Sequence, residues 1–115
     1  MLVPVKLKIL GWIKVSYLDE VIDDDGSTPL AGRTVPGDKK IEVSKEEHKD
    51  GETLHSTLLH ETIHHILSVS GHSEWLGSER EEAIVTALEN HLAPLVCFKT
   101  GASVRWKEIR MLWED

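Results

Sequence analysis

Residues 58–67, with the sequence Leu-Leu-His-Glu-Thr-Ile-His-His-Ile-Leu, contain the pattern H-E-x-x-H, and the rest of the chain is organised around them. An α-helix turns once every 3.6 residues, so side chains four positions apart lie on one face. On a helical wheel, leucine and isoleucine fill one arc of this segment, and His60, Glu61 and His64 follow at the rim of that arc. Side chains at such a rim are held in place by the core and remain accessible from a cleft. Two imidazoles beside a carboxylate suit a hydrolytic zinc site.

The helix that carries this motif is predicted over residues 52–70. Gly71 follows the last residues of the apolar pattern, where a glycine commonly ends a helix. A second helix is predicted over residues 79–93, with Ser78 as its N-cap and residues 75–78 as the linker before it. The second helix is expected to pack antiparallel to the first, because the connection between them is short.

Apolar and polar residues alternate in the segment before the motif. This period of two predicts strands over residues 3–10, 12–18, 30–35 and 39–43, separated by glycine, proline and aspartate turns. The short connections favour a small, mostly antiparallel sheet. The expected fold is therefore a single α+β domain over residues 1–115, with the sheet packed on the motif helix and the second helix.

The composition excludes several classes of protein. The 115 residues carry a net charge of −7, which argues against binding to nucleic acid or to an anionic membrane surface. No apolar stretch approaches the ~20 residues of a membrane span, and lysines interrupt the apolar N-terminus, so no signal peptide is predicted. The single cysteine rules out an intramolecular disulfide and fits a reducing compartment. A cytoplasmic protein is expected.

A third metal ligand is expected on the second helix, because catalytic zinc commonly takes three protein ligands and keeps one position for water. Three carboxylates open that helix: Glu79, Glu81 and Glu82. Glu81 lies within the apolar stripe, where a charge is costly unless it binds a ligand. Glu82 lies at the edge of the stripe, as the two histidines do on their helix. The wheel leaves the choice open. Thr86, one turn after Glu82, could hold a histidine ring in place.

The two motifs together resemble a known group of proteins. His60-Glu61-Thr62-Ile63-His64, followed by Glu82-Ala83-Ile84, is similar to the gluzincin clan of zinc peptidases. The likeness covers roughly residues 39–96, and the pattern around the two motifs resembles very small zincin-like proteins of phages and mobile elements, sometimes called minigluzincins. In thermolysin-like members the third ligand opens a Glu-Ala-Ile-type run, and Glu82 is the residue here that matches it. The chain departs from the clan at Val85, where serine or alanine is frequent.

The resemblance implies a zinc-dependent peptidase, whereas the residues themselves indicate a hydrolytic metal site. In this interpretation His60, His64 and Glu82 bind Zn²⁺, and Glu61 takes a proton from a zinc-bound water that attacks a peptide or protein substrate. An extended substrate is expected along an edge strand near residues 41–43. The alternatives are a zinc-binding regulatory or interaction module that cuts nothing and a metal-dependent hydrolase of other substrates.

Overall fold

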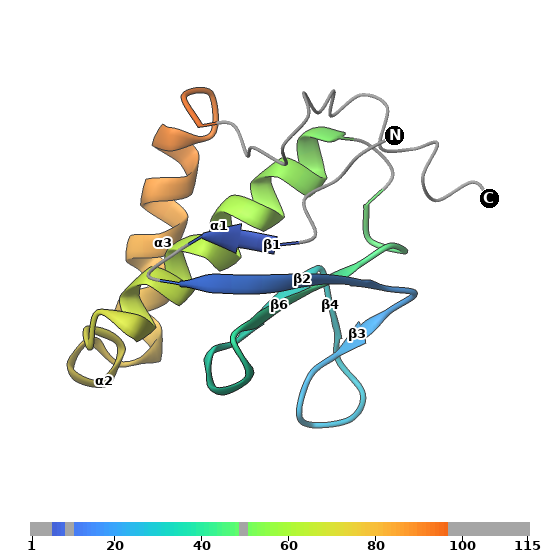
Figure 1. Ribbon diagram of the computed structural model, residues 1–115, viewed down its shortest axis with the longest axis horizontal. Helices are drawn as coiled ribbons and strands as arrows, with labels where there is room; N and C mark the ends of the chain where they lie inside the picture. Colours follow the sequence, from blue (N-terminus) through green and yellow to red (C-terminus); the bar gives the residue numbers. More distant parts are fainter. Residues whose placement is uncertain (1–5, 9–10, 49–50, 97–115) are drawn as a thin grey trace.

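The computed structural model describes residues 6–8, 11–48 and 51–96, so Cys97 and the C-terminal tail lie outside the described part. Figure 1 shows a sheet with the longest helix packed against it and a second long helix beside that one. The elements, in chain order, are β1 (Lys6–Lys8), β2 (Trp12–Leu18), β3 (Val21–Ile22), β4 (Pro29–Leu30), β5 (Gly32–Val35), the 3₁₀ turn η1 (Pro36–Asp38), β6 (Lys40–Ser44), α1 (Gly51–Val69), α2 (Ser73–Leu76) and α3 (Ser78–Leu92). The predicted α+β fold is confirmed. None of these helices is long and apolar enough to cross a membrane.

The main sheet has four strands in the order β1-β2-β6-β5, and β3 pairs with β4 in a separate antiparallel ladder. The outer pairs β1–β2 and β5–β6 are antiparallel, as expected. The central pair β2–β6 is parallel, with Val15 opposite Ile41. These two strands are far apart in the chain, and the intervening β3–β4 hairpin and β5 give the chain the length that a parallel crossover needs.

The core lies between the sheet and α1. Every second residue of the two central strands points toward the helix, and these side chains meet the first two turns of α1. Seven residues form this cluster: Leu7, Ile13, Val15, Ile41, Val43, Leu54 and Leu58. Five of them are at most 1% exposed, which fixes the first half of α1 on the sheet. The histidine motif follows directly after this anchored half.

α3 packs antiparallel against the other side of α1, as predicted. Leu59 and Ile63 of α1 form a small cluster with Val85 of α3. The direction follows from two contacts, since His55 meets Ala93 whereas His64 meets Glu81. Figure 1 shows α3 beside α1, with α2 at the end where the chain reverses.

The connection between the two helices differs from the prediction. Gly71 ends α1 with a φ of 80°, and its N–H donates to the carbonyl of Ser68 at 3.1 Å, as the expected glycine cap requires. The predicted linker over 75–78 instead contains the end of the short helix α2. Gly77, with a φ of 78°, is the N-cap of α3, so Ser78 is the first helical residue rather than the cap.

β5, and not the segment 41–43, is the edge strand nearest α1. Residues 41–43 are therefore not an edge strand, because β6 lies between β2 and β5 with a neighbour on each side. Among the described residues, no strand pairs with the outer edge of β5. Gly32 brings this edge close to the helix: a Cβ added there would lie 2.8 Å from Cγ2 of Thr57 and 3.0 Å from the carbonyl oxygen of Glu42.

Gly32→Ala is therefore expected to lower the free energy of unfolding by about 1–3 kcal/mol, the usual cost of overpacking a tight site. The neighbouring atoms are a β-branched methyl and a backbone oxygen, and neither can swing away. Urea denaturation of the purified protein measures the change. Gly37→Ala is the matched control, because nothing lies within 4 Å of its added Cβ. That variant should change stability by less than about 1 kcal/mol. Equal effects in the two variants would contradict the close approach of β5.

Candidate metal centre

The third and fourth turns of α1 place two histidine rings side by side. The ring centroids of His60 and His64 lie 4.9 Å apart, in an edge-to-face arrangement. Their side chains are 21% and 19% exposed, so the core holds them while solvent reaches their tips. This is the rim position that the sequence predicted for the pair.

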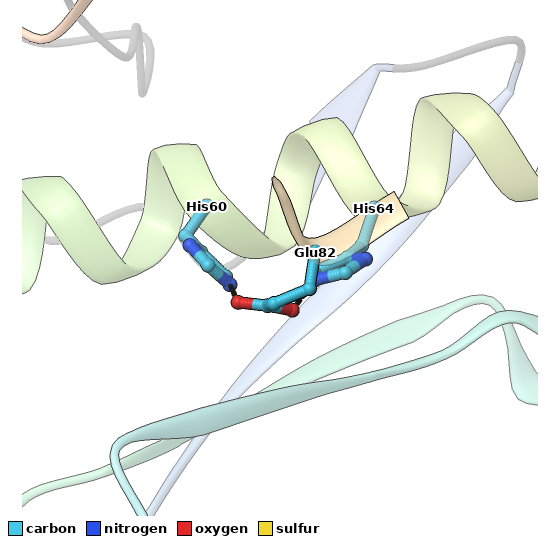
Figure 2. Close-up of side chains that lie close together, drawn as sticks. All are labelled: His60, His64 and Glu82. Carbon is cyan, nitrogen blue, oxygen red and sulfur yellow. Dashed lines mark hydrogen bonds and ion pairs between the residues drawn. The ribbon is translucent and has the colours of Figure 1, made fainter. Parts of the chain in front are cut away.

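The carboxylate of Glu82 lies between the two rings, as Figure 2 shows. Nε2 of His60 is 2.9 Å from Oε1 of Glu82, and Nε2 of His64 is 2.9 Å from Oε2. These three residues form a group whose ligand atoms all lie within 4.8 Å of one another, close enough to hold a metal ion. Glu82 is 55% exposed, which leaves one side of the group open to solvent. Glu79, another candidate from the sequence, is exposed and lies outside the group.

The opposite nitrogen of each ring has its own carboxylate. Nδ1 of His60 lies 2.8 Å from Oε1 of Glu89, and Nδ1 of His64 lies 2.5 Å from Oε2 of Glu81. A hydrogen bond donated from Nδ1 fixes the tautomer and leaves the lone pair on Nε2, the nitrogen that faces Glu82. Glu81 and Glu82 therefore have different roles, because they contact opposite nitrogens of His64.

Glu81 and Glu89, rather than Thr86, contact the Nδ1 atoms of the two histidines, and Thr86 is exposed. Sequence reasoning missed Glu89. A signal for it was present, since Glu89 follows Glu82 by seven residues, or two turns, and so lies on the same face of α3.

Burial and a neighbouring hydroxyl act on the carboxylate of Glu61, the predicted base. Its side chain projects from α1 toward β5, and the residue is only 8% exposed. Oγ1 of Thr34 lies 2.9 Å from Oε1 of Glu61 and 2.9 Å from the main-chain oxygen of the same residue. Burial raises the pKa of the Glu61 carboxyl above its ordinary value, although the hydrogen bond from Thr34 and the two nearby histidines oppose the shift.

The carboxylates around His64 favour its charged form when no metal is bound. Burial by itself lowers the pKa of His64, but the hydrogen bond to Glu81 and the nearby charges of Glu61 and Glu82 outweigh it, and the net pKa is raised. A group of carboxylates that stabilises a positive charge at this point also favours a cation in the same place.

A cavity of about 270 Å³ adjoins His60 on the side of β5, where Gly32, Glu61 and Glu89 are also among the residues that line it. A larger cavity of about 700 Å³ lies toward the first turns of α1. The two cavities share Ala31, Ser56 and Thr57 in their walls, so the hollow space extends along α1 away from the metal-binding group. An extended molecule therefore has room beside Glu61 and His60.

Glu89→Gln and Glu81→Gln are each expected to weaken the affinity of this group for a metal ion by about 10–100-fold, the usual effect of removing a group that orients a ligand. The uncharged amide either donates to or accepts weakly from Nδ1, so the ring tautomer is no longer fixed by a carboxylate. Titration with Zn²⁺ against a competing chromophoric chelator measures the affinity. Glu79→Gln, an exposed carboxylate on the same helix, is the matched control and should bind zinc as the wild type does. Unchanged affinity in both test variants would contradict the assigned roles.

Comparisons with known proteins do not place this chain in a family. No family model matches the chain, and no curated protein or solved structure matches it significantly. The likeness to gluzincins therefore rests on the residues quoted above, and the arrangement of His60, His64 and Glu82 is the main functional observation.

Proposed function

We propose that this protein is a zinc-dependent hydrolase of peptide bonds. The observation that carries the proposal is the convergence of His60, His64 and Glu82 beside the buried carboxylate of Glu61. Two imidazole nitrogens and one carboxylate oxygen form a donor set that suits Zn²⁺ and leaves a fourth position for water or substrate. Zinc in such a site lowers the pKa of a coordinated water and polarises a carbonyl group.

Three features of the chain would support the reaction. Glu89 and Glu81 hold the rings of His60 and His64 with Nε2 facing the ion. Glu61 lies on the next position of the same helix as His60, where it can accept a proton from the attacking water and pass it to the leaving amine. Burial raises the pKa of the Glu61 carboxyl above its ordinary value, the direction that helps it hold a proton between the two steps.

The outer edge of β5 supports a peptide as the substrate. The N–H of Ser44 donates to the carbonyl of Ala31 at 2.9 Å, which places Ala31 among the residues whose backbone faces β6. Backbone direction alternates along an antiparallel ladder, so Gly32 and Thr34 direct their N–H and C=O groups to the outer edge. A polypeptide added there as a further strand would run past Glu61. The side chain of Thr34, on the same strand, is already hydrogen-bonded to Glu61.

The test is cleavage of a peptide library by the zinc-loaded protein, read by mass spectrometry. Cleavage that stops when a chelator removes the metal and returns when Zn²⁺ is restored supports the proposal. One zinc per chain with no cleavage of peptides or of denatured proteins would overturn it and favour a zinc-binding interaction module. If the protein binds no zinc after reconstitution, neither the peptidase nor the zinc-binding interaction module is supported.

A further inference from the structure

Thr34 connects the edge strand to the predicted base. Its hydroxyl lies 2.9 Å from Oε1 of Glu61, across 27 positions of sequence. An ionised carboxylate only accepts hydrogen bonds, so Thr34 is the donor in this contact. The main-chain oxygen of Glu61 lies at the same distance from the hydroxyl, so the single hydroxyl proton is shared between these two acceptors on one turn of α1.

We propose that Thr34 is a positioning residue, whose hydroxyl holds Oε1 of Glu61 toward β5 and leaves Oε2 to receive the proton of the attacking water. This inference rests on the proposed function. It adds a link between the substrate-binding edge of β5 and the position of the Glu61 carboxylate. The backbone of Thr34 faces the outer edge of β5, where a substrate strand would pair, while its side chain faces α1. One residue thereby sets the position of the base relative to the substrate.

The packing around Thr34 makes this link stiff. Gly32, two residues earlier on the same face of β5, has no Cβ, and the strand approaches Thr57 and Glu61 closely there. Glu61 is 8% exposed, so few other orientations of its side chain are accessible. Threonine is itself restricted at χ1. A carboxylate held in this way needs little reorganisation when the proton moves, and a misplacement of about 1 Å can cost about 100-fold in rate.

The experiment compares Thr34→Val, which keeps the shape and removes the donor, with Thr34→Ser, which keeps the donor. Thr34→Val is expected to lower kcat by roughly 10- to 100-fold, with KM changed by less than about threefold, because the base and not the binding edge is disturbed. Thr34→Ser is expected to retain kcat within about threefold of the wild type. Zinc content per chain should be the same in all three proteins.

The controls separate this inference from the proposed function. A wild type that binds zinc and cleaves nothing overturns both. An active wild type with an equally active Thr34→Val variant overturns only the role of Thr34, and so does loss of zinc in that variant. In a Glu61→Gln background, Thr34→Val should have no further effect on the residual rate, because the two residues act as one unit. If Thr34→Val does not fold, Thr34→Ala against Thr34→Ser gives the same comparison.

Discussion

Glu61→Gln is expected to lower kcat for peptide hydrolysis by about 10²–10⁴-fold, the usual contribution of a general base, while the protein keeps its zinc. Glutamine has the shape of glutamate but cannot take a proton from water at neutral pH. Its amide oxygen can still accept the hydrogen bond that Thr34 donates to Oε1 of Glu61 at 2.9 Å. The three residues of the metal-binding group are unchanged. The substitution therefore removes proton transfer and little else.

Three measurements on the same preparation make the result specific: kcat on a substrate from the peptide library, zinc per chain, and the midpoint of thermal unfolding. The expected pattern is loss of kcat with the other two unchanged or slightly improved, because a buried carboxylate has been replaced by a neutral group. A variant that still cleaves at the wild-type rate would show that another group accepts the proton. Loss of zinc together with activity would place Glu61 among the ligands.

The part of the site that lies on one helix was predictable, because helical spacing alone brings its residues together. His60, Glu61 and His64 depend only on the 3.6-residue turn and on the apolar residues that choose which face is buried. The bounds of α1 followed from the same pattern and from Gly71, whose positive φ few other residues adopt readily. The structure has the two histidine rings half-buried, as that pattern expected, whereas Glu61 is buried rather than at the rim, with its carboxylate bonded to Thr34 of β5.

The rest of the site depends on contacts between distant segments. Thr34 reaches Glu61 because the strand order places β5 beside α1. Strand order is a property of the whole sheet rather than of any local pattern. The parallel pairing of β2 with β6 was missed for the same reason. Glu81 and Glu82 are neighbours in sequence, and a helical wheel cannot say which nitrogen of His64 each one meets. Their separation follows from how α3 packs on α1.

Glu82→Ala is expected to abolish zinc binding at the concentrations used for activity, a larger loss than the roughly 10–100-fold expected for a residue that only orients a ligand. Among the described residues, Glu82 is the one carboxylate whose two oxygens reach Nε2 of both His60 and His64, each at 2.9 Å. Removing it leaves two nitrogen ligands on a half-exposed helix face, and two ligands hold zinc poorly where three or four are usual. Hydrolysis should be lost with the metal. Zinc per chain and competition with a chromophoric chelator measure the change.

The comparison with Glu81→Ala decides between the two adjacent carboxylates. Glu81 contacts Nδ1 of His64, the nitrogen that faces away from the group, so its removal should weaken zinc binding without abolishing it. Glu79→Ala, which shortens an exposed side chain on the same helix, should bind zinc normally. The reverse order, with zinc lost in Glu81→Ala and kept in Glu82→Ala, would mean that His64 presents Nδ1 to the ion. That result would exchange the roles of the two carboxylates, and it would require the ring of His64 to turn over when metal binds.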